Sequence, residues 1–283
     1  MNKSAINPRN ERRLPQHSLR PWVINSIGRS SQNEPATYRI FPNMNCEIFF
    51  NFGDHEVNTS VGSDIRPLRR ATVFGPKTAC YQHRVGAVTD WFLVQLTPLG
   101  ARTLLDCPVA ALVNSDADLG AVLADSDGLV DAIEEAGDFH SRLVIFEQWA
   151  KTRLARSPSR VRVSALSALH GTMRALPFGE IGQFAERIDV GQRQFRTIMR
   201  DEIGLAPKEL LNLLRIEQGW ISLYGTGSIS EASNLFADHA HFSREFRRFT
   251  GISPREYKRL KLSGDLIVNG FDEAVAAQLL LSA

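Results

Sequence analysis

Residues 229–254 read ISEASNLFADHAHFSREFRRFTGISP, and this stretch decides the fold of the C-terminal half. Its apolar residues form two short sets at helical spacing, and Ala237-Asp238 between them is a turn and cap signal. Gly251 follows the second set, where helices commonly take a residue with positive φ. The pattern predicts two short helices joined by a tight turn, which is the helix-turn-helix arrangement.

An earlier stretch, residues 180–207, repeats this organisation with the sequence EIGQFAERIDVGQRQFRTIMRDEIGLAP. An Asp-Val-Gly break separates its two apolar sets. Gly204 and Pro207 then stand three residues apart, as Gly251 and Pro254 do in the later stretch. Two units in series are much stronger evidence for a DNA-binding domain than one arginine-rich helix would be.

A leucine-rich segment, residues 208–224, lies between the two units and is long enough for one connecting helix of ~25 Å. The charge balance changes along the chain. Residues 156–262 hold 17 Lys and Arg against 11 Asp and Glu, whereas residues 101–155 hold 4 against 10. An acidic segment next to a basic one indicates separate units with different surfaces.

The stretch Phe236–Pro254 closely resembles the C-terminal signature of the AraC/XylS family of transcription regulators. Five residues upstream fall on matching positions of that family's first unit: Ala185, Phe195, Gly204, Pro207 and Arg215. The resemblance covers residues 160–262. It implies a sequence-specific DNA-binding regulator of transcription, with two recognition helices that enter successive major grooves of double-stranded DNA.

By position, the resemblance assigns base reading to eight residues on the second helix of each unit. They are Gln192, Arg193, Arg196, Thr197, His239, Ala240, Ser243 and Arg244. Arginine and glutamine suit this role because each can bind a base edge through two hydrogen bonds. Contacts to DNA phosphates, which position a protein without reading sequence, are assigned to Arg200, Lys208, Arg247, Arg248, Arg255 and Lys258. His241 is expected to serve in local packing.

The second unit departs from the family pattern. About two residues are missing between Ile229 and Phe236, and Leu235 stands where the family has a glycine. Thr197 occupies a position that is often arginine. We therefore expect a shortened first helix and a turn without its permissive residue. These departures leave open an alternative function, an interaction protein whose helix-turn-helix fold no longer reads DNA.

The N-terminal half is expected to be β-rich, so the fold class is α+β. Short apolar, β-prone runs at residues 46–52, 71–76, 79–82 and 91–96 are bounded by Gly and Pro, which favours an antiparallel sandwich or barrel. We divide the chain into a β-rich effector domain (1–105), a helical connector (106–156), the DNA-binding domain (160–262) and a tail (263–283), which could add a helix over 274–281.

Residues 94–108, VQLTPLGARTLLDCP, resemble the N-terminal region of a subgroup of AraC-type regulators. That resemblance implies a sensory domain and a small-molecule effector, and by family analogy a dimer contact through the helix around residues 143–154. Seven aromatic residues are expected to form the sheet core or to line a ligand pocket: Trp22, Phe41, Phe49, Phe52, Phe74, Trp91 and Phe92. We also expect a loop cluster formed by Arg66, Arg69 and Arg70, and a solvated acidic face over residues 116–138.

Catalysis, a bound metal and a cofactor are not expected, although an enzyme in the N-terminal half remains the second alternative. Cys46, Cys80 and Cys107 show no C-x-x-C spacing. The histidines His17, His55, His83 and His140 are isolated in sequence. No apolar run approaches the ~18 residues of a membrane span, and the basic N-terminus does not resemble a signal peptide. These features predict a cytoplasmic protein, and leave RNA polymerase and a second copy of the chain open as partners.

Overall fold

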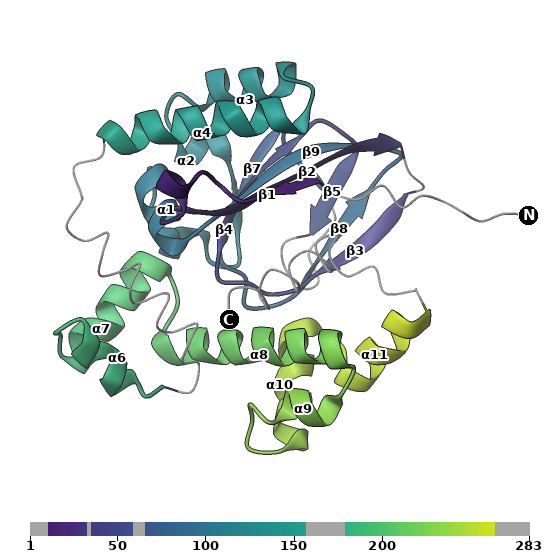
Figure 1. Ribbon diagram of the computed structural model, residues 1–283, viewed down its shortest axis with the longest axis vertical. Helices are drawn as coiled ribbons and strands as arrows, with labels where there is room; N and C mark the ends of the chain where they lie inside the picture. The colour runs from purple at the N-terminus through teal and green to yellow at the C-terminus, as the bar shows by residue number, and fades with distance from the viewer. Residues whose placement is uncertain (1–10, 33–34, 59–65, 157–178, 264–283) are drawn as a thin grey trace, which may run out of the picture.

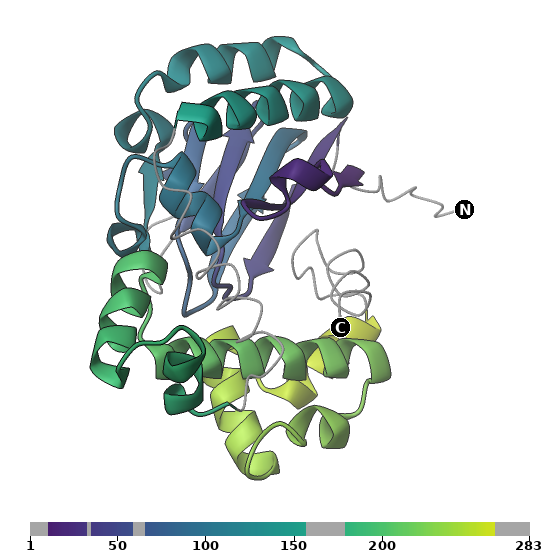
Figure 2. The same ribbon diagram turned by 60° about the vertical axis from the view of Figure 1, so that its left-hand side comes forward.

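The computed structural model describes residues 11–32, 35–58, 66–156 and 179–263. They form two lobes, a β-rich N-terminal lobe and an all-helical C-terminal lobe (Figures 1 and 2). The linker expected near residue 160, the helical signals just after it and the helix expected over 274–281 lie outside the described residues.

Two antiparallel sheets form the N-terminal lobe. The larger has the order β1 (Glu11–Arg13), β2 (Val23–Gln32), β9 (Val88–Leu96), β4 (Cys46–Asn51), β7 (Ala71–Phe74) and β10 (Asp116–Asp118). The smaller has the order β3 (Ala36–Ile40), β8 (Tyr81–Val85), β5 (His55–Asn58) and β6 (Arg66–Pro67). This confirms that the N-terminal half is β-rich and antiparallel, and two sheets form where a sandwich or a barrel had been left open. The strand expected at residues 79–82 begins at Tyr81.

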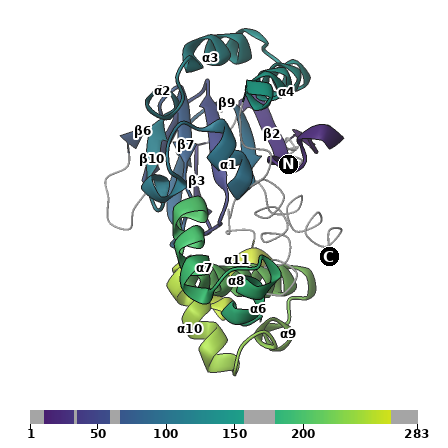
Figure 3. The ribbon, with the colours of Figure 1, turned by 90° about the vertical axis from the view of Figure 1, so that its left-hand side faces the viewer.

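Alternation along the strands divides the side chains between two cores. In β4, Ile48 and Phe50 pack with the helices of this lobe, whereas Phe49 points between the two sheets. Those helices are η1 (His17–Leu19), α1 (Pro98–Leu104), η2 (Val109–Leu112), α2 (Leu119–Val122), α3 (Ser126–Glu135) and α4 (Phe139–Arg156). Helices α3 and α4 cover the side of the N-terminal lobe that faces away from the C-terminal lobe (Figure 3).

The apolar face of α4 packs on the lobe's own sheet. Leu143, Phe146 and Ala150 are buried in the same core as Ile48 and Phe50. Val144 is the exposed large apolar residue of this helix among those described, at 49% exposure. The expected dimer contact through residues 143–154 would therefore have to use the polar outer face of α4.

The arginine cluster was expected to decorate a loop, and the acidic segment after it was expected to be solvated. The acidic segment is mostly exposed, as expected, but the two groups also form ion pairs with each other. Arg66 and Arg69 both bind Asp116, whose side chain is 3% exposed, and Arg70 binds Asp131 at 2.8 Å. Because Asp116 lies on β10, these pairs fix the edge of the larger sheet.

The aromatic residues do not gather around one pocket. Phe49, Phe74 and Trp91 lie between the sheets, and Phe92 lies on the helical side. Phe41 contradicts the expectation outright, since it leaves the N-terminal lobe and packs in the core of the C-terminal lobe. Trp22 and Phe52 are partly buried against the helix-side core.

The C-terminal lobe consists of α6 (Ile181–Arg187), α7 (Gln192–Ile198), the π-helical turn η3 (Met199–Ile203), α8 (Pro207–Thr226), α9 (Ile229–Ser233), α10 (His239–Thr250) and α11 (Pro254–Ser263). Helix α8 has 20 residues, so it is about 30 Å long, slightly longer than expected. Figure 1 shows α6 and α7 at one end of α8, and α9, α10 and α11 at the other.

Candidate nucleic-acid interface

The first helix-turn-helix unit is α6, a short turn and α7. Phe184, Ala185 and Phe195 are almost fully buried, which fixes the orientation of both helices. The turn between them uses Asp189 in the left-handed region, with φ 53°. A short polar side chain tolerates this conformation better than most residues do. The predicted break at Asp-Val-Gly is therefore the turn of the unit.

Helix α7 presents the expected polar face. Gln192, Arg193, Arg196 and Thr197 are all exposed, and Arg200 is exposed on η3. Within the described parts of the chain, none of these three arginines forms an ion pair. Their guanidinium groups are thus available to an anionic or hydrogen-bonding partner.

The second unit is α9, a turn and α10. Both helices begin at a side-chain cap: the Ser228 hydroxyl accepts from the Glu231 N–H at 3.2 Å, and an Asp238 oxygen accepts from the His241 N–H at 2.6 Å. That hydrogen bond lowers the pKa of Asp238, and the charge of Arg244 contributes to the same shift. The charged carboxylate is therefore the form that caps α10.

The turn of the second unit does not need the glycine that is missing at Leu235. The positive-φ residues other than glycine among those described are Asn114, Asp125 and Asp189, so Leu235 has ordinary backbone geometry. Helix α9 is indeed short, with five residues, and the Phe236 N–H donates to the Ser233 carbonyl at 2.9 Å just after it. The deletion is absorbed by a shorter helix.

Phe236 packs on two residues at the start of α10. Its ring centroid lies 5.0 Å from that of Phe242 and 5.6 Å from that of His241. The half-buried His241 thus has the packing contact that was expected of it.

On the outer side of α10, His239, Ala240 and Arg244 are exposed and Ser243 is half-buried. The six residues assigned to phosphates are all exposed: Arg200, Lys208, Arg247, Arg248, Arg255 and Lys258. Arg248 is already engaged, because it pairs with Glu245 at 2.7 Å and its guanidinium lies 4.1 Å from the Phe249 ring centroid.

The residues assigned from sequence do not include Gln194 and Arg259, which are exposed on α7 and α11. Each directly follows an assigned contact residue, Arg193 or Lys258, on the exposed side of its helix, and that position could have revealed them.

These exposed faces are accessible with the N-terminal lobe in place. The two lobes meet instead through η3 and through the buried end of the second unit.

Residues 184–260, which span both units, match a family described as a helix-turn-helix domain. Residues 11–118 match a family described as a domain of unknown function, DUF6597. The chain therefore carries an AraC-type helix-turn-helix domain, the DNA-binding part of a transcription regulator.

Several solved structures show a partial likeness of fold, all at low sequence identity. ToxT from Vibrio cholerae is 13% identical, with a TM-score of 0.47 over 81% of this chain and 99% of ToxT. A ToxT structure with bound unsaturated fatty acid is 12% identical, with a TM-score of 0.44 over 84% and 94%. The AraC-like transcriptional activator CuxR is 11% identical, with a TM-score of 0.26 over 76% and 88%. No curated protein matches the sequence.

Outside the DNA-binding lobe, the structure joins two histidines that are distant in sequence. Nδ1 of His55 lies 2.9 Å from Nε2 of His83, and the Phe49 ring packs on both imidazoles, with Trp91 stacked on Phe49. Burial, together with the charge of His55, lowers the pKa of His83 to about 3. Across the described residues, no three His, Cys, Asp or Glu side chains are grouped to hold a metal ion.

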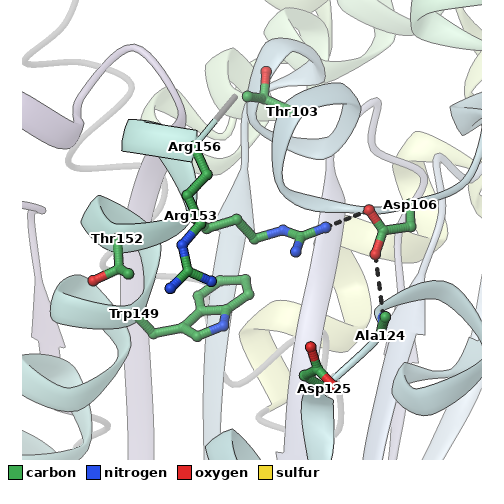
Figure 4. Close-up of a pocket in the computed structure, with 8 residues that line it drawn as sticks. All are labelled: Thr103, Asp106, Ala124, Asp125, Trp149, Thr152, Arg153 and Arg156. Atoms are coloured by element: carbon green, nitrogen blue, oxygen red, sulfur yellow. Dashed lines mark hydrogen bonds and ion pairs between the residues drawn. The ribbon is translucent and has the colours of Figure 1, made fainter. Parts of the chain in front are cut away.

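A pocket of about 380 Å³ lies in the N-terminal lobe, beside α1 and the end of α4 (Figure 4). Its lining residues are Thr103, Asp106, Ala124, Asp125, Trp149, Thr152, Arg153 and Arg156. Asp106 accepts from Arg153 and from the Ala124 N–H, so its carboxylate is occupied. This lining includes no histidine or cysteine.

No described helix is both long and apolar enough to cross a membrane.

Proposed function

We propose that this regulator inserts α7 and α10 into successive major grooves and reads bases with both. The observation that carries the proposal is the contrast between the two faces of each helix. Phe195 on α7 and Phe242 and Phe246 on α10 are buried, whereas the opposite faces are exposed and basic. Bases would be read by Gln192, Arg193, Arg196, Thr197, His239, Ala240, Ser243 and Arg244.

Phosphate contacts would hold the two helices in register on the duplex. Arg200 and Lys208 lie close in sequence to α7, and Arg247 lies on α10, while Arg255 and Lys258 lie on α11. Such contacts supply affinity that falls steeply with salt. The pairing of Arg248 with Glu245 makes it the weakest of the six phosphate candidates.

Selection from random duplex DNA with the full chain tests the proposal. The winning duplex is then bound at several salt concentrations. We expect a motif with two blocks about one helical turn apart, since that spacing places both helices on one side of the duplex. A single block would show that the shortened second unit does not read bases.

The rival is an interaction protein that keeps the fold without reading DNA. It predicts no enriched motif and a weak dependence of nucleic-acid affinity on salt. A protein with Arg193, Arg196 and Arg244 replaced by Ala is the matched control. If the wild type enriches no motif and binds random duplex DNA no more tightly than this variant does, the rival is correct.

The pocket at the end of α4 could take a small anionic effector. Trp149 offers a flat apolar surface there, and Arg156 has no ion-pair partner among the described residues. Arg153 still binds Asp106, so Arg156 is the cation available to a carboxylate. Stabilisation of the protein by a panel of aromatic carboxylates tests this, with Arg156→Gln as the variant that should lose the effect.

The remaining parts of the proposal follow from the role of a DNA-binding regulator. Its place of action would be the cytoplasm, where bacterial-type promoters are found, and RNA polymerase would be a partner during activation. A homodimer is also proposed, and sedimentation with and without the selected duplex tests it.

A further inference from the structure

One end of the N-terminal lobe reaches into the second helix-turn-helix unit. Phe41, directly after β3, is 5% exposed and lies in the core of the C-terminal lobe. Its ring centroid is 5.5 Å from Trp220 of α8, 6.4 Å from Phe246 of α10 and 6.0 Å from Tyr257 of α11. Met44, 2% exposed, joins the same core. The core of the second unit is therefore incomplete without the N-terminal lobe.

A backbone hydrogen bond closes the same contact. The N–H of Cys80, just before β8, donates to the carbonyl of Phe249 at 3.0 Å. The last four carbonyls of a helix have no partner within it, and Phe249 belongs to the last turn of α10. The N-terminal lobe thus satisfies an end group of a recognition helix.

The first unit meets the N-terminal lobe at a different place. Helix α1 and η2 pack against η3, and Nε of Arg102 donates to Glu202 at 3.1 Å. Gly204, at φ 82°, lies so close to η2 that an added Cβ would be 2.6 Å from Cγ2 of Val113. Each unit therefore has its own contact with the N-terminal lobe.

Hydrogen bonds connect the two contact points. The N–H of Lys77 donates to the Asn43 carbonyl at 2.8 Å, and Lys77 Nζ donates to the Ser115 carbonyl at 2.8 Å. Asn114 exchanges side-chain hydrogen bonds with Thr78, each 2.8 Å long, one of them from the Thr78 backbone N–H. We call residues 41–45, 76–80 and 109–115 the rim. Hydrogen bonds within the rim connect the contact made by the second unit to the contact made by the first.

We propose that the rim sets the spacing between the two recognition helices, with Phe41 as the positioning residue for α10. Helix α8 alone does not do this, because it packs mainly on α9 and α10 and continues from the first unit through the turn at Gly204. The inference rests on the proposed function, in which both α7 and α10 read bases. The consequence is a preference for one separation between the two DNA blocks.

The test uses the full chain and the duplex that the wild type selects. The two blocks of that duplex are moved apart or together by one or two base pairs, which rotates one block relative to the other. We expect the wild type to lose about tenfold or more in affinity on re-spacing. Phe41→Ala should reduce that discrimination to about threefold while base preferences within the α7 block stay unchanged.

Matched variants separate positioning from stability. Phe49→Ala removes an equally buried ring from the core between the sheets, and should leave the spacing preference intact. Phe41→Leu, which keeps an apolar side chain, should restore most of the preference. Asn114→Gly keeps the positive φ and removes the bonds to Thr78, so it loosens the rim without opening a core. It should weaken the preference even if Phe41→Ala folds poorly.

Hydrogen exchange of the free protein gives a readout that does not involve DNA. In Phe41→Ala, exchange should rise in α10 and α11 and not in α6 and α7. Unchanged exchange in α10, or a spacing preference that survives in both Phe41→Ala and Asn114→Gly, would overturn the spacing role alone. A wild type that selects no two-block site would overturn the proposed function as well, and the two failures are thereby distinguished.

Discussion

The guanidinium of Arg142 donates two hydrogen bonds to the carboxylate of Asp90, at 2.6 and 3.0 Å, and so joins α4 to β9. Its Nε also donates to the Ile133 carbonyl at 3.1 Å, and the guanidinium lies 4.8 Å from the Phe52 ring centroid. The Arg142 side chain is 3% exposed and that of Asp90 is 24% exposed. This buried cation thus links the helical layer to the larger sheet.

Asp90→Asn should destabilise the N-terminal lobe by about 3 kcal/mol, because it leaves the buried Arg142 charge without a counter-ion. Chemical denaturation followed by tryptophan fluorescence measures the effect. The control is Glu56→Gln, which breaks the exposed Arg84–Glu56 pair of 3.0 Å and should cost less than about 1 kcal/mol. Equal losses in the two variants would show that the Arg142 pair is no stronger than a surface pair.

Gly204 lies shortly before α8 and Gly227 directly follows it, so the two glycines offer a matched comparison. Both have positive φ, 82° and 67°, so alanine at either site should cost about 1–2 kcal/mol. An alanine Cβ at position 227 would have its nearest neighbour at 3.9 Å, whereas at position 204 it would meet Val113 at 2.6 Å. Gly204→Ala should therefore cost at least ~1 kcal/mol more in unfolding free energy. If the costs are equal, the lobes do not meet at η3 in solution.

Arg193 and Arg247 should differ in how they contribute to DNA binding. Arg193→Ala should relax preference at one or two base pairs, by about 1–3 kcal/mol, because it removes a base contact. Arg247→Ala should weaken all sequences about equally and reduce the salt slope by about one. Competition binding with single-base variants of the selected duplex measures both. A uniform loss in Arg193→Ala would contradict its place in the major groove.

The His55–His83 pair should make the N-terminal lobe sensitive to acid. His83 has a pKa of about 3 in the folded protein and an ordinary value near 6.5 when unfolded. The unfolded chain therefore binds a proton first, so stability is full above about pH 6.5 and falls as pH drops toward 3, by up to about 1.4 kcal/mol per pH unit. Unfolding midpoints across this range measure the slope. It should be shallower in His83→Gln and unchanged in His140→Gln, a variant of an exposed histidine.

The two helix-turn-helix units could be predicted from sequence because their signals are local. Gly204 and Gly251 end helices at positive φ, and Asp238 caps α10 through an N–H three residues away. The buried phenylalanines recur at helical spacing, so the exposed faces follow from them. Each of these features depends on residues within a few positions of one another, and periodicity captures such relationships.

Other features depend on contacts between distant positions, and spacing does not reveal them. Asp116 lies 50 residues after Arg66, its partner, and His83 lies 28 residues after His55. Phe41 was expected in the sheet core or a pocket because its neighbourhood is β-rich. Its true neighbours, such as Trp220, are set by how the two lobes dock. Docking is decided by shape across the whole surface, which one sequence does not display.

The closure of α10 by Cys80, and of its core by Phe41, has a consequence for engineering new biosensors from this chain. A chimera that joins residues 179–263 to a foreign sensor would leave Trp220, Phe246 and Tyr257 facing water, and the Phe249 carbonyl without its donor. A graft at the connection between the two lobes therefore removes contacts that the C-terminal lobe needs. A donor sensor must supply an aromatic side chain in place of Phe41 and a backbone N–H in place of that of Cys80. Otherwise the recipient must retain the loops that carry Phe41 and Cys80.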